Sequence, residues 1–200
     1  MCYYLPYKKI KQLYRSEKNQ HNVTAWVNDY SDVLYGYVVQ RVKDPDTAKD
    51  LLQETFLAAW RNVDKYNGEA SVKTWLFTIL KNKIIDHYRK ISGKYTEELV
   101  HDDTDSNAFF DNTGHWAKGS YPSDWGNIPV ESKEFFAILQ KGIKMLKDIQ
   151  AAVFSMKYLD DMESEEICKV LNITPSNYWV LIHRAKVQLK VYLESNWQGG

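Results

Sequence analysis

Helical periodicity runs through most of this chain, and no other feature limits its fold so strongly. Apolar residues recur at steps of three and four in the segments 24–42, 47–63, 72–90, 132–146, 147–159, 164–171 and 174–197. That spacing gives an α-helix one apolar face, whereas a half-buried strand needs strict alternation, which we do not find. Pro45 and Pro175 stand where a proline can open a helix. The sequence therefore predicts an all-α fold.

Between residues 96 and 130 the periodicity is lost. The segment is rich in Gly, Pro, Asn, Asp and Ser, which is typical of a linker. Residues 96–136 hold 9 acidic side chains against 2 basic ones, whereas residues 1–95 hold 16 basic against 10 acidic. Aromatic residues within the linker suggest that part of it docks on protein. We therefore expect four parts: an extension at 1–22, a helical domain at 23–95, an acidic linker at 96–130 and a second small helical domain at 131–197.

Composition excludes several classes of protein. No apolar run approaches the roughly 20 residues that a membrane-spanning helix needs, and the basic N-terminus lacks the apolar block of a signal peptide. The two cysteines, Cys2 and Cys168, are far apart in the chain. They are too few for a disulfide framework or a four-cysteine zinc site, and they suit a reducing cytoplasm. We expect a cytoplasmic protein with no membrane insertion, no bound metal and no other cofactor.

The segment 72–90 mixes aromatic residues with five lysines and arginines. At about 100° per residue, one narrow arc of the predicted helix carries Thr74, Thr78, Lys81, Asn82 and Arg89. Trp75, Leu76, Ile79 and Leu80 point elsewhere and are predicted to be core. Hydroxyls, an amide and cations in one line suit a phosphate backbone or unpaired bases. The preceding loop, 66–71, is placed to offer a base a small pocket; the alternative is an ordinary solvated helix face.

The segment 47–63 is predicted to be amphipathic. Its buried side should hold Leu51, Leu52, Thr55, Phe56, Ala59 and Trp60. Asp50, Gln53 and Glu54 lie at i, i+3 and i+4, and Phe56 and Leu57 flank them. Acids and an amide beside apolar residues form a plausible docking patch for a basic helical partner. Ordinary surface solvation explains these residues equally well.

Two capped helices near the C-terminus have the spacing of a helix-turn-helix. Ser164 is the predicted N-cap of the first, and Thr174, followed by Pro175, is the predicted N-cap of the second. Tyr178, Ile182 and Ala185 should pack on the first helix. The exposed side and its margins then carry Ser176, Asn177, Trp179, Val180, His183, Arg184 and Lys186. The pattern favours major-groove binding only slightly over a plain helical bundle.

Three stretches together carry a resemblance to a known family: "DPDTAKDLLQETFLAAW", "VKTWLFTILKNKIIDHYRK" and "EEICKVLNITPSNYWVLIHRAKVQL". In this order and spacing they resemble the extracytoplasmic-function (ECF) sigma factors of the sigma-70 family, over about residues 25–95 and 131–193. The resemblance implies two helical domains, sigma2-like and sigma4-like, that bind core RNA polymerase and direct it to promoters. It implies partners as well: the β′ coiled coil, the β flap, promoter DNA and an anti-sigma factor. A free sigma factor of this kind is expected to be a monomer and not an enzyme.

The resemblance also implies residue roles. Contact with core polymerase falls to Asp50, Gln53, Glu54 and Phe56. Melting of the −10 element and capture of a flipped base fall to Tyr66, Asn67, Gly68, Glu69, Ala70, Ser71, Thr78, Lys81, Asn82 and Arg89. The −35 element falls to Ser176, Asn177, Trp179, Val180, His183, Arg184 and Lys186. Family members often carry basic residues where this chain has Trp179 and Leu181, so the −35 contacts depart most from the family pattern.

Two other functions would explain parts of the sequence. A stand-alone helix-turn-helix regulator would explain residues 131–197 but leaves the loop and polar arc at 66–89 without a role. A metal-dependent nuclease would use the linker acids Asp102, Asp103, Asp105 and Asp111. Metal catalysis needs rigidly held carboxylates, and a Ser- and Gly-rich linker gives them no support, so an acidic spacer is the better interpretation.

Overall fold

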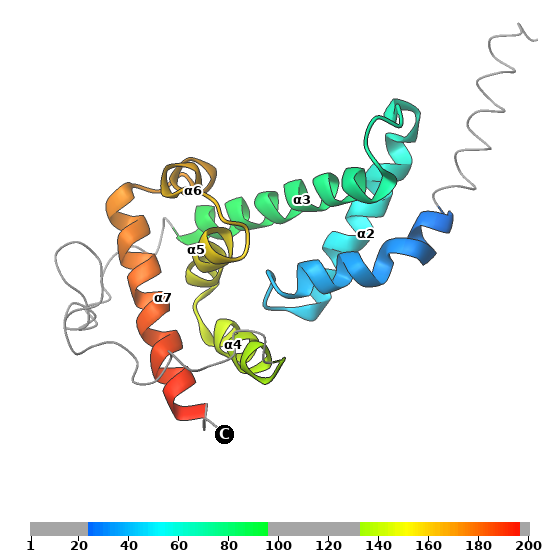
Figure 1. Ribbon diagram of the computed structural model, residues 1–200. Helices are drawn as coiled ribbons and strands as arrows, with labels where there is room; N and C mark the ends of the chain where they lie inside the picture. The colour runs from blue at the N-terminus through cyan, green and yellow to red at the C-terminus, as the bar shows by residue number, and fades with distance from the viewer. Residues whose placement is uncertain (1–23, 96–132, 197–200) are drawn as a thin grey trace, which may run out of the picture. The chain divides into compact units, whose positions relative to one another are not determined.

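The computed structural model describes residues 24–95 and 133–196, and every regular element in these ranges is helical (Figure 1). This confirms the predicted all-α class. The chain divides into two compact units, one ending at Ile84 and the other beginning at Ile85. The first contains a helix over residues 24–39, α2 (Pro45–Arg61), the short 3₁₀ helix η1 (Val63–Lys65) and the start of α3 (Val72–Tyr95). Helix α3 continues without a break past the division.

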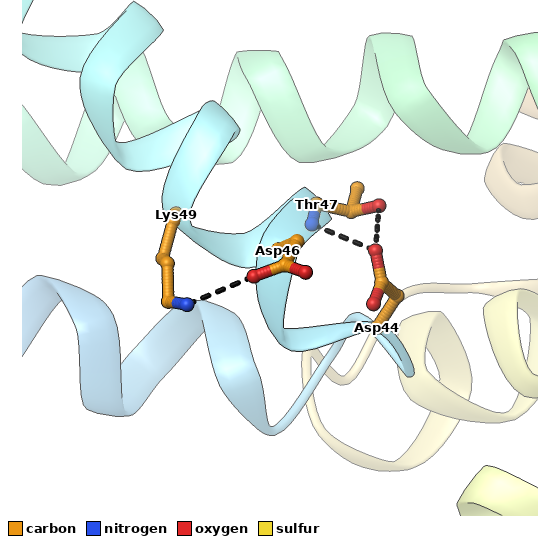
Figure 2. Close-up of polar contacts among 4 residues, drawn as sticks. All are labelled: Asp44, Asp46, Thr47 and Lys49. Carbon is orange, nitrogen blue, oxygen red and sulfur yellow. Dashed lines mark hydrogen bonds and ion pairs between the residues drawn. The ribbon is translucent and has the colours of Figure 1, made fainter.

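Helix α2 begins where the sequence predicts. Asp44 has an extended backbone and caps the helix, while Pro45 takes the first helical position. The Asp44 carboxylate accepts hydrogen bonds from the Thr47 backbone N–H at 2.8 Å and from the Thr47 hydroxyl at 2.7 Å (Figure 2). Beside this cap, Lys49 donates to Asp46 at 2.8 Å. The cap satisfies a backbone donor that the first turn otherwise leaves unpaired, and so fixes the start of α2.

Loss of the Asp44 cap is expected to lower the stability of the protein in a pH-dependent way. The Thr47 side-chain and backbone hydrogen bonds hold the pKa of Asp44 below its ordinary value of 3.8. The cap therefore contributes fully above pH 3.8, and its contribution disappears as pH falls through the lower, folded-state pKa. Thermal melts should show Asp44→Ala melting below the wild type at pH 7 and the gap closing at acid pH. Asp44→Asn is the control, because asparagine also caps but does not titrate; equal melting of the Ala and Asn variants would contradict the cap.

The first unit is held together by an apolar core and by aromatic rings. Its buried apolar side chains are Trp26, Leu34, Val38, Val42, Ala48, Leu51, Phe56, Ala59, Val63, Leu76, Leu80 and Ile84. Edge-to-face contacts tie the helix 24–39 to α3, with ring centroids 5.9 Å apart for Trp26 and Trp75 and 5.2 Å for Tyr37 and Phe77. The prediction of core positions is confirmed for Leu76 and Leu80, whereas Trp75 and Ile79 are only half-buried.

The second unit is built around its last helix. Helices α4 (Lys133–Met145), α5 (Asp148–Tyr158) and α6 (Ser164–Leu171) all pack against α7 (Pro175–Asn196) (Figure 1). One cluster of its core consists of Ile143, Leu146, Ala151, Ala185 and Leu189. Gly142 permits a close approach, because a Cβ atom there would lie 2.9 Å from the Tyr192 ring and 3.0 Å from the Leu189 side chain. The small residue lets α4 and α7 pack tightly.

The predicted helix-turn-helix is present as α6 and α7. Asn172 ends α6 in the left-handed conformation, with φ 52° and ψ 48°, and turns the chain towards α7. Thr174 caps α7, since its hydroxyl accepts the Asn177 N–H at 3.2 Å, which confirms that prediction. The predicted cap at Ser164 is wrong by one residue: Glu163 occupies the cap position and Ser164 is already helical. The Glu163 side chain makes no capping hydrogen bond. Its extended backbone alone marks it as the residue before the first helical one.

Several predictions concern residues outside the described ranges. They include the extension at 1–22, the acidic linker and its cluster at Asp102, Asp103, Asp105 and Asp111. Among the residues that the structure does describe, no group of three or more His, Cys, Asp or Glu side chains is placed to hold a metal ion. Within the same residues, none of the helices combines the length and apolar character that crossing a membrane requires. Cys168 is half-buried on α6, and burial raises the pKa of its thiol.

Candidate nucleic-acid interface

The loop before α3 has a defined shape. The Tyr66 hydroxyl donates to the Ala70 carbonyl at 2.6 Å, and the Asn67 side chain accepts the Glu69 N–H at 3.1 Å. Gly68 has φ 79°, a backbone conformation that favours glycine. The Tyr66 ring lies against Trp75, with centroids 4.9 Å apart. The loop is thus closed by its own hydrogen bonds and anchored to α3 through one ring.

The loop ends at the N-terminus of α3, where Ser71 accepts the Thr74 N–H at 3.1 Å. The side chains that the sequence places along one arc of this helix are all exposed: Thr74, Thr78, Lys81, Asn82 and Arg89. The loop residues Asn67, Gly68, Glu69, Ala70 and Ser71 are exposed as well, and Tyr66 is half-buried. The predicted loop residues 67–71 and the first four arc residues are therefore all exposed in the first unit, and the loop leads directly into α3.

Three arc residues already have partners within the protein, and the first is Thr74, whose hydroxyl lies 2.8 Å from the Ser71 hydroxyl. The Thr78 hydroxyl donates to the Thr74 carbonyl at 3.0 Å, so only its oxygen lone pairs face solvent. Arg89 forms an ion pair with Asp86 at 3.0 Å, with both side chains more than half exposed. Such a surface pair contributes little stability. A phosphate can therefore compete with Asp86 for the Arg89 Nη1 atom at small cost, while Nε donates to the Val170 carbonyl at 3.4 Å.

Helix α7 separates a buried face from a polar one. Tyr178, Leu181, Ile182, Ala185, Leu189 and Leu193 are buried, which confirms the predicted burial of Tyr178, Ile182 and Ala185. Ala185 belongs to the cluster with Ile143, Leu146 and Ala151, and not to a contact with α6 alone. Leu181 faces the core, so its apolar character reflects packing and not DNA reading. The predicted contact residues lie elsewhere on the helix: Ser176, Trp179 and Val180 are exposed, and Asn177, His183, Arg184 and Lys186 are half-buried.

The polar face of α7 carries positive charge but a neutral histidine. Burial and the nearby Lys186 charge lower the pKa of His183. At neutral pH its imidazole is therefore uncharged, and its Nε2 atom is buried in this structure. The Lys186 ammonium lies 5.7 Å from the centre of the Tyr158 ring, a contact that steadies the side chain at the border of this face.

The exposed face of α2 carries all of the predicted docking residues except Phe56. Asp50, Gln53 and Glu54 are exposed, and Glu54 forms an ion pair with Lys83 of α3 at 3.0 Å. Phe56, however, is 9% exposed and belongs to the core, so little of its side chain is available to a partner. Helix α2 turns this side chain inward together with Ala59 and Leu51, so Phe56 is left out of the exposed docking residues.

Two other apolar residues of α2 are exposed beside the predicted docking residues. Leu57 is 50% exposed and Trp60 is 48% exposed. Both lie on the same side of α2 as Asp50 and Gln53, since positions three, four and seven residues apart share a helix face. Leu57 was recognised in the sequence only as a neighbour of the acids, and Trp60 was assigned to the core. We refer to Asp50, Gln53, Glu54, Leu57 and Trp60 as the α2 face.

Comparison with known proteins identifies the family. Residues 26–93 match Sigma-70 region 2, and residues 136–189 match Sigma-70, region 4. A "Probable RNA polymerase sigma factor" of Haemophilus influenzae is 33% identical over 189 residues, which is 94% of both chains. The chain belongs to the sigma-70 family. The ECF RNA polymerase sigma factor SigW of Bacillus subtilis is 28% identical and covers 93% of this chain and 95% of its own.

Among solved structures, the sigma factor RpoE in complex with the anti-sigma factor NepR, from Bartonella quintana, is 19% identical with a TM-score of 0.41. It covers 88% of this chain and 99% of its own. The family matches confirm the predicted ECF sigma factor. The protein directs transcription initiation at promoters as a sigma factor, and it is not a stand-alone regulator. Sigma factors are DNA-binding initiation factors, and the polymerase carries out the chemistry.

Proposed function

We propose that this sigma factor divides its work among three surfaces. The α2 face binds core RNA polymerase, the 66–71 loop with the α3 arc opens the −10 element, and α7 reads the −35 element. The observation that carries the proposal is the continuity of the second surface. A loop closed by the Tyr66–Ala70 hydrogen bond leads directly into a line of exposed hydroxyl, amide and cationic side chains.

At the −10 element, shape and charge have separate tasks. Asn67, Gly68 and Glu69 are exposed, and the hydrogen bond between the Asn67 side chain and the Glu69 N–H restrains the turn, so the loop can surround a base at a reduced cost in conformational entropy. Lys81 and Asn82 follow on α3, about three turns after the loop, where a cation can hold a phosphate and an amide can bind a base edge. Thr78 and Arg89 extend the same line. The aromatic residues of α3 anchor this surface to the helix 24–39.

At the −35 element, the N-terminal turns of α7 enter the major groove. Ser176, Asn177 and His183 offer donors and acceptors to base edges. Arg184 and Lys186 hold phosphates, and Trp179 borders the face with its ring against Tyr178, at 5.2 Å between centroids. A near-neutral C-terminal part is suited to bind DNA weakly by itself and to depend on the polymerase for affinity.

Family membership supplies the partners of this proposal. The α2 face docks on the β′ coiled coil, whose basic side chains complement Asp50 and Glu54, and the C-terminal unit meets the β flap. An anti-sigma factor keeps the free protein inactive. The free protein is a monomer, and it works in the cytoplasm, where the polymerase is found.

Transcription with purified components tests the proposal. Run-off reactions on genomic fragments, with core RNA polymerase and with or without this protein, should give transcripts only when both are present. A gel shift on the resulting promoter should show a complex with the holoenzyme and little or none with the free protein. Absence of any start site, or tight binding of the free protein to DNA, would contradict it.

Replacing Asn82 by alanine is expected to slow promoter opening about tenfold, because the strand loses one hydrogen bond worth about 1.4 kcal/mol in the open complex. Binding to core polymerase should be unchanged, since Asn82 lies on α3 and is not one of the α2 face residues. Permanganate footprinting measures opening, and fluorescence anisotropy measures binding. Asn28→Ala is the matched control, an exposed asparagine on the helix 24–39. Equal losses of opening and binding in Asn82→Ala would remove this role.

A further inference from the structure

Val180 occupies an unusual place on the DNA-facing side of α7. It is 44% exposed, yet it has no polar atom in its side chain. Its neighbours one turn away on the helix are polar: Ser176 and Asn177 precede it, and His183 and Arg184 follow it. The opposite side of α7 is filled by core residues. Val180 therefore lies at the centre of the exposed face and not at its border.

The charge of α7 argues for a nucleic acid as the surface that covers Val180. Residues 175–193 contain Arg184, Lys186 and Lys190 and no acidic residue; the first acid of the helix is Glu194. Within one turn of Val180 this face carries Ser176, Asn177, His183 and Arg184, which fits the wall of a DNA groove better than an apolar protein surface. Two other apolar side chains of α7 are exposed, Trp179 at the edge of the face and Val191 about three turns further along. The position near the N-terminus of α7 is where a recognition helix meets base edges.

Only one group in the major groove is apolar. Guanine, cytosine and adenine present donors and acceptors there, and a valine brought against them would leave those groups without hydrogen-bond partners. Thymine presents its C5 methyl group beside a single acceptor. When an exposed valine at the centre of the DNA-facing side packs against this methyl group, the burial of apolar surface stabilises the complex. The other three bases lack the methyl group and bind less well.

We propose that Val180 reads a thymine methyl group in the −35 element and so determines specificity at that base pair. The inference rests on the proposed role of α7 at the −35 element and adds which base edge is recognised and by which side chain. Val180 here is a specificity residue: it sets the choice of promoter without a part in the opening of DNA.

Replacing thymine by uracil tests the proposal, because uracil lacks only the methyl group. A promoter is first obtained by run-off selection with the holoenzyme, and each −35 thymine on either strand is then replaced singly by deoxyuridine. Burial of one methyl group corresponds to about a fourfold change in affinity. We expect about a fourfold weaker holoenzyme complex for uracil at one position. Val180→Ala, which lacks both γ-methyl groups and so falls short of the base, should bind both promoters alike, and Val180→Thr, which keeps one γ-methyl group, should retain part of the discrimination.

Val191 provides the matched control. It is 54% exposed and lies on nearly the same side of α7, about 16 Å further along the axis. Val191→Ala should keep the full preference for thymine. The proposal is overturned if no uracil substitution weakens binding, if the selected −35 element contains no thymine, or if Val180→Ala still prefers thymine. Failure to select any promoter would instead overturn the proposed function itself.

Discussion

Replacing Trp60 by alanine is expected to weaken binding to core RNA polymerase about 30-fold while the protein stays folded. Trp60 is 48% exposed on α2, so its truncation leaves no cavity in the core. Large aromatic side chains at the centre of an interface commonly contribute about 2 kcal/mol or more, which corresponds to that loss of affinity. Fluorescence anisotropy with labelled protein and purified core polymerase measures the affinity, and thermal melting of the free protein measures the fold.

Two further variants sharpen this test. Asp50→Lys reverses a charge on the same face and should weaken binding as well, since its proposed partner is basic. Val33→Ala removes an exposed apolar side chain, 41% accessible, from the helix 24–39 and should leave the affinity unchanged. If Trp60→Ala and Asp50→Lys both bind like the wild type, the α2 face is not the docking surface.

Helix α2 shows what periodicity predicts and what it leaves open. The spacing of Leu51, Thr55 and Ala59 identifies the buried side correctly. Phe56 and Trp60 are four residues apart and were grouped together on that side, yet only Phe56 is buried. A helical pattern sets the direction of each side chain but not how far the neighbouring helices extend. Trp60 is the last residue but one of α2, and its side chain remains half uncovered.

Local signals were sufficient where one side chain alone can form the capping hydrogen bond. Thr174 was correctly predicted as a cap because its hydroxyl needs only the N–H three residues ahead. Ser164 failed because two adjacent residues compete for one cap, and the backbone conformation of Glu163 decides between them. The α3 arc follows from 100° steps alone. The shape of the 66–71 loop cannot be derived in the same way. It includes a contact between the Tyr66 and Trp75 rings, and helical periodicity does not predict which rings meet.

Replacing Phe56 by alanine is expected to destabilise the first unit by about 3 kcal/mol, because a buried phenyl ring is lost and a cavity remains. Phe56 is 9% exposed and lies on the same buried side as Ala59 and Leu51. Core binding should fall only as far as the folded fraction falls. Chemical denaturation followed by circular dichroism gives the free energy of unfolding, and anisotropy under the same conditions gives the affinity.

The Phe56→Leu variant distinguishes two roles for Phe56: packing in the core beneath α2, or direct contact with the polymerase. Phe56→Leu keeps most of the apolar volume and should cost less than about 1.5 kcal/mol. A residue that supports α2 from inside should tolerate this change with nearly full affinity for the polymerase. A residue that touches the polymerase should lose affinity as Trp60→Ala does, although the protein remains stable. If Phe56→Leu is folded but binds core enzyme about 30-fold more weakly, the aromatic ring makes direct contact after all, and α2 must then expose in the holoenzyme a side chain that it buries in the free protein.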